Sequence, residues 1–350
     1  MSGPTPPIQP LGSAQIPALL DTWATHRGRA TPRDSARAAW GRPLVERRAL
    51  LEGVLRGSLH GAGERSRALV AGRVGTVTAY LIAHEVRLPR GSGYRAYAPD
   101  HFLSIGGDDW GVADPRAADL LADLYAEIAA WGLARGADAQ LLAIPDGDDC
   151  AEFWLDLGFA RQDRYAFLPR GAERPAPCGL TVRRAGPADL ERAVHFTLAE
   201  AHHHHRAPIY AFAPPDLDAT RRRDMAENLD NPATIVLLAE ADGVALGGLS
   251  AFPLAGLGGW MPSATPTPCL YIDSAFVEPT ARGRGVLRAL VAALADLAEQ
   301  RGACGLFVTY LPANRGAARA WTALGFQALL TVHQRRLDPR AARQHRTPGI

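Results

Sequence analysis

The sequence contains no lysine: its 38 basic residues are all arginine, and they nearly balance 36 acidic residues to give a formal net charge of +2. A nucleic-acid-binding protein needs a basic excess on one face, so we expect no nucleic-acid partner. No apolar run approaches the ~18 residues of a membrane span, and the first ten residues, MSGPTPPIQP, lack the basic and apolar regions of a signal peptide. We therefore expect no membrane partner and a cytoplasmic location.

Cysteine is scarce and scattered. The four cysteines, Cys150, Cys178, Cys269 and Cys304, form no CxxC pair. Their spacing argues against a zinc site and against a disulfide framework. We therefore expect small buried residues in a reducing compartment, and no metal cofactor.

An internal repeat organises the chain, whose 350 residues and hydrophobic content of 47% are sufficient for two domains. Arg135-Gly136-Ala137 and the apolar run after it recur 166 residues later, beginning with Arg301-Gly302-Ala303. Segment 153–159 (FWLDLGF) recurs 167 residues later as 320–326 (AWTALGF), so one inserted loop residue explains the change of offset.

Helical periodicity precedes each matched strand, and a shorter helix that stops at Gly158 or Gly325 follows it. The longer helices are expected at 118–134 and 286–300. In the second half, the patterns also predict helices at 187–201 and 216–229 and strands at 180–184, 235–240, 245–252 and 270–277. This alternation favours a mixed α/β layer fold.

A Pro-rich charged segment at 169–177 (PRGAERPAP) can pack into neither core and therefore separates the halves. The expected organisation is a first domain at 1–170, a linker at 171–177, a second domain at 178–338 and a disordered arginine-rich tail at 339–350.

The most specific pattern is the decapeptide 277–286 (VEPTARGRGV), between an apolar strand and a helix. Gly283 and Gly285 let backbone N–H groups converge, the helix adds the positive end of its dipole, and Arg282 and Arg284 add charge. Such a loop suits a pyrophosphate, although an ordinary glycine-rich connection is the alternative. A nucleotide P-loop would end in GK[ST], and a dinucleotide GxGxxG does not fit the spacing.

This loop resembles the pyrophosphate loop of the GNAT acetyltransferases, whose pattern is V-x-P-x-x-R-G-x-G-[IV] at the start of a helix. Asn314, Ala317, Ala320, Trp321, Leu324, Gly325 and Phe326 also fall at the spacing of the family's N-x-x-A-x-x-L-Y-x-x-L-G-F motif. The resemblance covers residues 180 to about 337. It implies tandem GNAT folds, each a twisted, mostly antiparallel sheet flanked by helices, with two strands splayed apart to admit the pantetheine arm of acyl-CoA.

The resemblance also implies an N-acyltransferase that moves an acetyl or other short acyl group from CoA directly to a small-molecule amine. Phe276 and Val277 would line the pantetheine arm. The remaining cofactor-binding positions it implies are Arg282, Gly283, Arg284, Gly285, Val286 and Leu287 at the pyrophosphate, Asn314 beside pantetheine and Arg319 near the phosphates.

Two positions depart from the family pattern. Leu287 stands where Gly or Ala is preferred, at little cost, since backbone groups do the binding. Trp321 replaces the frequent catalytic tyrosine, and an indole N–H cannot protonate a departing thiolate. Tyr310, at the end of a strand, is the first candidate for that acid, with Tyr271 behind it.

The candidate base is Asp273, because strand alternation places it on the same side as Val277 and family members often carry an acidic residue there. Its role would be to accept a proton or to anchor the amine, and a hydrogen-bonded strand-end carboxylate is the alternative. The run from His202 to His205 offers imidazoles near the acceptor region, or a solvated helix end. Adjacent histidines point in different directions, which disfavours a metal site.

The first half lacks the binding loop. At the 166-residue offset, Gly283 falls on Ala117 and Gly285 on Asp119, whose carboxylate would oppose phosphate binding or cap a helix. We expect a degenerate domain that packs against the second half or shapes the acceptor site. The alternative to an enzyme is a non-catalytic acyl-CoA sensor or scaffold, and the sequence indicates neither the acceptor nor the oligomeric state.

Overall fold

The computed structural model describes residues 6–29, 41–61, 65–172, 179–254, 263–338 and 340. The first half contains, in chain order, β1 (Ile8–Pro10), α1 (Ile16–Arg29), α3 (Leu44–Gly61), β2 (Ser66–Arg73), β3 (Thr76–Arg87), β4 (His101–Ile105), β5 (Trp110–Val112), α4 (Asp119–Ala134), β6 (Ala139–Pro145), α5 (Ala151–Asp156) and β7 (Ala160–Pro169). The second contains β8 (Thr181–Arg184), α6 (Leu190–His204), α7 (Leu217–Asp230), β9 (Ile235–Ala241), β10 (Val244–Leu254), β11 (Cys269–Val277), α8 (Val286–Gln300), β12 (Gly305–Tyr310), α9 (Arg315–Ala323) and β13 (Gln327–Arg336). Apart from β5 and short 3-10 turns, the two halves share one order of elements.

The predicted helices and strands agree closely with these elements. The pattern expected over 286–300 coincides with α8, whose buried residues recur at three- and four-residue spacing. Gly158 and Gly325 adopt φ values of 87° and 88° immediately after α5 and α9, the left-handed conformation in which glycine stops a helix. The helix expected at 187–201 is shifted: α6 spans Leu190–His204 after a 3-10 turn, so three residues of the histidine run are helical.

All strands except β5 join in one path, β1-β2-β3-β4-β6-β13-β7-β12-β11-β10-β9-β8, while β5 pairs with β3. The pairs are antiparallel except for β4 with β6 and β11 with β12. The expected mixed, mostly antiparallel sheet flanked by helices is thus confirmed.

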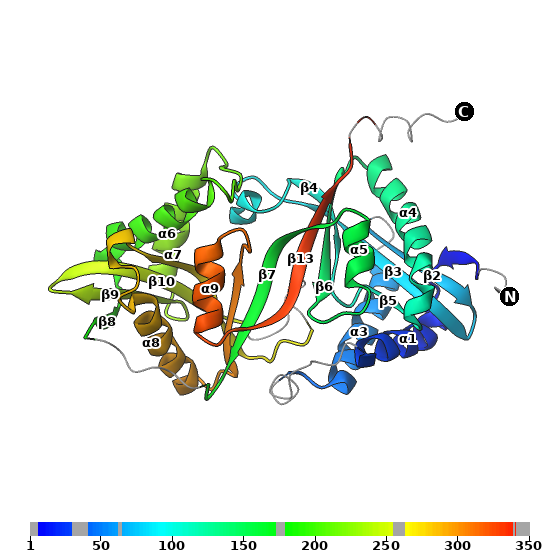
Figure 1. Ribbon diagram of the computed structural model, residues 1–350, viewed down its shortest axis with the longest axis horizontal. Helices are drawn as coiled ribbons and strands as arrows, with labels where there is room; N and C mark the ends of the chain where they lie inside the picture. Colours follow the sequence, from blue (N-terminus) through cyan, green and yellow to red (C-terminus); the bar gives the residue numbers. More distant parts are fainter. Residues whose placement is uncertain are drawn as a thin grey trace.

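The halves exchange their last strands, which the sequence did not predict. β7 ends the first half but pairs with β12 of the second, and β13 ends the second half but pairs with β6 of the first. β7 and β13 then pair with each other at the centre, where green and red strands lie side by side in Figure 1. Read from either end, the strand order is the same, so each half is completed by the other.

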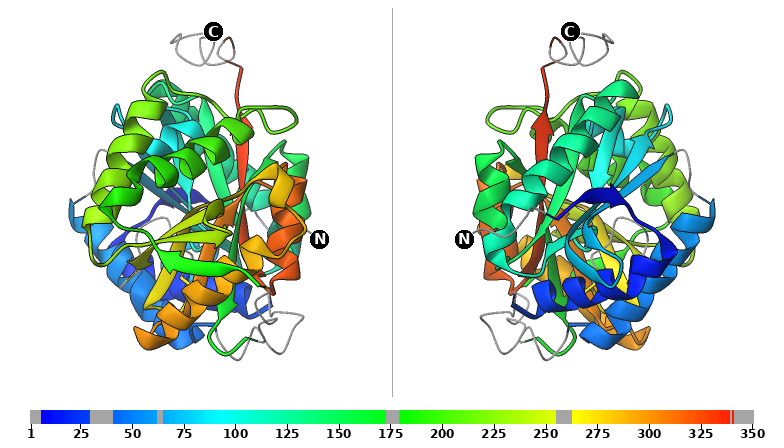
Figure 2. Two further views of the ribbon diagram at one scale, coloured as in Figure 1. Left: turned by 90° about the vertical axis from the view of Figure 1, so that its left-hand side faces the viewer. Right: turned by 90° about the vertical axis from the view of Figure 1, so that its right-hand side faces the viewer.

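Strand alternation gives each end of the sheet two packed faces. In the first half, α4 covers the face of Leu81, and α1 with α3 covers the opposite face of Tyr80. In the second half, α8 covers the face of Leu237, and α6 with α7 covers the face of Leu238. Figure 2 shows these helices from the two ends of the molecule. The pairs α1/α3 and α6/α7 leave the middle of the sheet between them.

The expected linker and tail lie almost entirely outside the described residues. The chain is described up to residue 172 and again from 179, and beyond 338 only Arg340 is described. The domain limits therefore stay expectations, with the qualification that β7 belongs to the first half in sequence and to both halves in its pairing. Among the described helices, none is both long enough and apolar enough to cross a membrane.

Candidate active site

The loop between β11 and α8 takes its shape from two glycines. After a 3-10 turn at Pro279–Ala281, Gly283 and Gly285 adopt φ values of 78° and 81°. Residues other than glycine rarely adopt this left-handed backbone conformation. Gly285 is the N-cap of α8, and open space surrounds the position that a Cβ on Gly283 would take. The sequence therefore uses both glycines for backbone conformation.

This loop presents donors and positive charge. The hydrogen-bond ladder of α8 begins with the N–H of Ala289, which donates to the carbonyl of Gly285 at 2.9 Å, so the N–H groups before it are not used by the helix. The side chains of Arg282 and Arg284 are exposed. Arg282 folds back over the Phe276 ring at 5.6 Å. These residues fit a bound pyrophosphate.

Strands β11 and β12 separate beside this loop. Their parallel pairing extends only over Leu270–Ile272 opposite Leu306–Val308. Beyond that point, Asp273 on β11 and Tyr310 on β12 face a common cavity. The opening between the two strands is where the resemblance places the pantetheine arm.

The cavity has a volume of about 1270 Å³ and lies over the middle of the sheet, between α1/α3 and α6/α7. Both halves line it. Tyr97 and Asp163 come from the first half, and Glu200, Arg221 and Asp273 come from the second. The cavity therefore belongs to neither half alone.

Glu200 and Asp273 form an acidic pair beside Arg221. Burial raises the pKa of Glu200 to about 7 although Arg221 and a hydrogen bond from Ser274 oppose the shift. Burial also raises the pKa of Asp273, again against the attraction of Arg221. Both carboxylates are only half-buried, since they face the cavity. A carboxyl group with a pKa near 7 suits proton transfer at neutral pH.

Sequence reasoning missed Glu200, although a signal was present. Ala193, Thr197, Glu200 and His204 recur at four- and three-residue spacing on α6, and the first two are buried. A carboxylate within the buried stripe of an amphipathic helix is unusual and points inward. Arg221 was also missed, because it belongs to a run of three arginines on α7, and such a run is typical of a solvent-exposed helix face.

The histidine run divides among different partners. His202 contacts Asp218 at 3.2 Å, and His205 donates from Nδ1 to the carbonyl of Ala211 at 2.9 Å. His204 lines the cavity, and burial lowers its pKa to about 4, so it is a poor proton acceptor at pH 7.

His204 also links the halves. Its Nδ1 lies 3.2 Å from the Tyr97 hydroxyl, and the Asn314 amide approaches its Nε2 at 3.4 Å. Asn314 itself caps α9 by accepting the N–H of Ala317 at 3.1 Å. The second family motif thus meets the first half of the chain through one imidazole.

Residues 199–326 match the family model described as the acetyltransferase (GNAT) family. These residues hold the glycine loop, the splayed strands and the carboxylate pair. They form a GNAT acetyltransferase domain. No curated protein matches the sequence.

Solved structures extend the likeness to the whole chain. A GCN5-related N-acetyltransferase from Sphaerobacter thermophilus is 19% identical, with a TM-score of 0.56 over 96% of this chain and 97% of that one. That match shows a shared fold. The aminoglycoside N-acetyltransferase AAC(6')-Iy in complex with CoA is 22% identical over 47% of this chain and 96% of that chain, with a TM-score of 0.36. AAC(6')-Ih from Acinetobacter baumannii is 18% identical over 43% and 91%, with a TM-score of 0.34.

The other sequence candidates take different places in the GNAT domain. Tyr310 lines the cavity, and so does Tyr271, whose hydroxyl lies 3.0 Å from Thr309 Oγ1. Trp321 packs against Phe326 in the core and is 5% exposed, which leaves it no part in proton transfer. Arg319 is exposed on α9.

In the first half, a buried side chain occupies the place that corresponds to the opening between β11 and β12. α4 begins at Asp119 directly after a 3-10 turn, without a left-handed glycine in the connection. Trp110, which falls on Phe276 at the 166-residue offset, is fully buried, and its indole donates to the Ala143 carbonyl at 3.0 Å. This side chain joins β5 to β6 across the region where β11 and β12 part.

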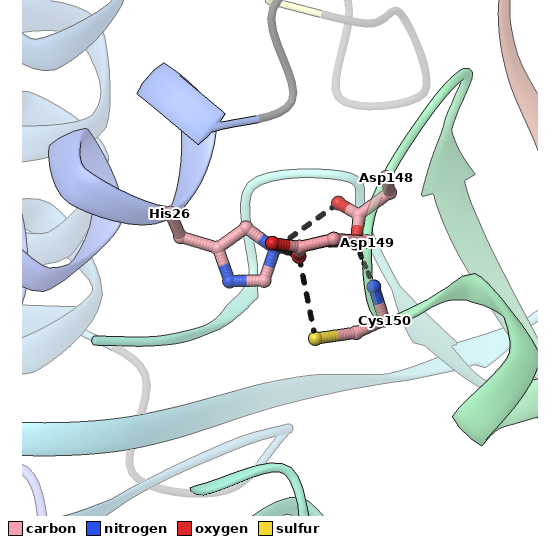
Figure 3. Close-up of side chains that lie close together, drawn as sticks. All are labelled: His26, Asp148, Asp149 and Cys150. Carbon is pink, nitrogen blue, oxygen red and sulfur yellow. Dashed lines mark hydrogen bonds and ion pairs between the residues drawn. The ribbon is translucent and has the colours of Figure 1, made fainter. Parts of the chain in front are cut away.

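A polar cluster near the end of α1 has the composition of a metal site, but its side chains are already held by hydrogen bonds and ion pairs within the chain. His26, Asp148, Asp149 and Cys150 bring potential ligand atoms within 4.8 Å of one another (Figure 3). The N–H of Val112 donates to His26 Nδ1 at 2.8 Å, so the proton on Nε2 points to Asp148 at 3.1 Å.

Arginines already neutralise this cluster. Arg27 donates to Asp148 at 2.5 Å and Arg29 to Asp149 at 2.8 Å. Burial raises the pKa of Cys150 to about 12, so its thiol stays protonated at neutral pH. The cluster is an ion-pair network, buried at His26, Arg27 and Asp148 and exposed at Asp149, that connects α1 to the loop before α5.

Proposed function

We propose that the protein is an acyl-CoA-dependent N-acyltransferase that transfers a short acyl group, most simply acetyl from acetyl-CoA, to a small-molecule amine. The observation that carries this proposal is the junction of three features in one GNAT domain: the glycine loop at α8, the parting of β11 from β12, and an acidic cavity at that opening. The loop supplies donors for a pyrophosphate, the opening leads inward, and the cavity provides proton acceptors.

In this proposal, the backbone of Phe276 and Val277 and the loop residues Arg282 to Leu287 hold acyl-CoA. Asn314 stands beside pantetheine, and Arg319 lies near the phosphates. The bound thioester supplies the acyl group.

Glu200 and Asp273 act as a coupled pair that takes the proton from the attacking nitrogen, because the amine must be neutral to attack. Arg221 keeps the pair from holding two protons. Tyr310 is the candidate donor to the departing thiolate, with Tyr271 as the reserve.

The carboxylates of the cavity support an enzyme over a sensor. A sensor needs the loop alone, whereas this chain adds two half-buried carboxylates with raised pKa values in a cavity that reaches the end of β12. Carboxyl groups perturbed by burial concentrate at catalytic sites.

The test incubates the purified full-length chain with acetyl-CoA and each of a panel of primary amines, and measures the release of free thiol. Amine-dependent thiol release is expected. Stoichiometric acetyl-CoA binding with no thiol release from any amine would favour the sensor.

A further inference from the structure

Asp163 is an unusual residue in the wall of the cavity. It lies on β7, the strand that the first half contributes to the sheet of the second, and it is 7% exposed. Alternation places it on the same face as Tyr165, and both line the cavity. Its Oδ2 has no hydrogen-bond partner among the described residues, and burial alone raises the pKa of Asp163 to about 7.

The chain treats other buried carboxylates differently. Glu85 accepts hydrogen bonds from two arginines and a histidine. Asp148, which is buried, and Asp108, which is half-buried, each accept a hydrogen bond from an arginine. A buried carboxylate without a partner costs stability. Asp163 therefore calls for a ligand that compensates this cost.

The surroundings of Asp163 suit a nitrogen cation. Tyr94, Tyr97 and Tyr165 line the cavity. Burial is the main cause that raises the pKa of each phenol, and the charge of Asp163 adds to each shift. Tyr97 also feels the charges of Glu200 and Asp273, so it lies near both Asp163 and the proposed catalytic pair in this cavity. Aromatic rings next to a desolvated carboxylate favour an alkylammonium group.

We propose that Asp163 binds a second cationic nitrogen of the acceptor, so that the preferred acceptors are diamines or longer polyamines lying across Tyr97. One nitrogen reaches Glu200 and Asp273 for acylation, and the other pairs with Asp163. The acylation part rests on the proposed function, but binding of the second nitrogen does not. The cavity volume of about 1270 Å³ leaves room for such a molecule, since typical small-molecule pockets have ~300–1,000 Å³.

The kinetic test compares α,ω-diaminoalkanes of four to eight carbons with monoamines of equal length, using full-length protein and acetyl-CoA. The wild type should prefer the best diamine roughly 10- to 100-fold in kcat/KM, the range for a hydrogen bond to a charged group. Asp163→Asn should remove this preference while kcat on the monoamine changes little. Asp146→Asn is the matched control, because Asp146 also lines the cavity but is paired with Arg164 at 3.7 Å.

A binding test separates this proposal from the acyltransferase proposal. Calorimetry with CoA present and no acyl group should show diamine binding to the wild type and to Asp146→Asn, and its loss in Asp163→Asn with CoA affinity retained. Diamine binding without turnover would overturn the acyltransferase and keep the role of Asp163. Monoamine turnover without a diamine preference, or a preference that survives Asp163→Asn, would overturn the role of Asp163.

Discussion

Glu200, Asp273 and Arg221 come from three elements, α6, β11 and α7, and meet only in the folded chain. Two carboxylates beside one guanidinium retain a net negative charge when both are ionised. That charge attracts an ammonium, and the raised pKa of Glu200 then allows it to accept the ammonium's proton. In the proposed function, one arrangement of three side chains would therefore both attract the amine and deprotonate it.

Replacement of these carboxylates should impair turnover much more than acyl-CoA binding. We expect Glu200→Gln and Asp273→Asn each to lower kcat/KM by ~10²- to 10⁴-fold, the usual contribution of positioned proton transfer. Because the pKa of Glu200 is about 7, wild-type activity should rise with pH through that value, and this limb should disappear in Glu200→Gln. Rates within about threefold of wild type, with acetyl-CoA affinity unchanged, would refute the assigned role.

Asp163 should make stability depend on pH. Its pKa is about 7 in the folded chain against an ordinary value of 3.8, so between these values the folded state holds a proton that the unfolded state has lost. The free energy of unfolding therefore falls as pH rises from about 4 to about 7.

An asparagine side chain does not titrate, so Asp163→Asn does not lose stability in this way as pH rises. The melting temperature of Asp163→Asn minus that of the wild type should therefore be larger at pH 8 than at pH 5. Thermal melts of both proteins at the two pH values provide the measurement. An equal difference at both values would mean that Asp163 titrates normally.

In the proposed function, the junction of β11, its loop and α8 places the cofactor interactions in one continuous segment. An acidic side chain there would both strain the left-handed N-cap and repel phosphate. Gly285→Asp should therefore abolish acyl-CoA binding, and the wild type should bind one acyl-CoA per chain by calorimetry.

Gly302→Asp is the matched control, because Gly302 lies beyond the other end of α8 with a φ of 71° and open space around it. Gly302→Asp strains a left-handed backbone position as Gly285→Asp does, but it places no negative charge near the loop. Binding that survives Gly285→Asp, or a stoichiometry of two, would contradict this account of the halves.

At this scale, the sequence predicted most elements because their signals are local. The glycines that stop α5 and α9, the apolar stripe of α8 and the strand–loop–helix junction each lie within about 20 residues. The burial of Trp110 was not predicted, since it depends on β5 bonding to β6 through a side chain.

The whole molecule is held together by the exchanged strands. β13 lies between β6 and β7, and β12 pairs with both β7 and β11. A fragment of residues 177–350 would lose β7, leaving β13 without a neighbour and β12 as an exposed edge. Unpaired edges of this kind promote aggregation.

We therefore expect the fragment of residues 177–350 to be insoluble or inactive alone, which agrees with a required first half. Co-expression with residues 1–176 should restore a complex, because each piece supplies the strand that the other lacks. Co-purification and acyl transfer by the pair provide the measurement. A soluble 177–350 fragment with full transfer activity would show that neither the exchange nor the cavity wall is needed.

The sequence by itself determined the fold class, the glycine loop and the order of elements from about residue 118 onward, because periodicity, glycine placement and motif spacing act over short stretches of chain. Only the tertiary structure decided which half closes which sheet and which side chains face the cavity. Asp163, Glu200 and Asp273 stand on separate elements, and only the fold brings them to one cavity. Their pKa values rise because distant parts of the chain pack around them and remove them from water. The residues next to them in the sequence do not indicate that packing.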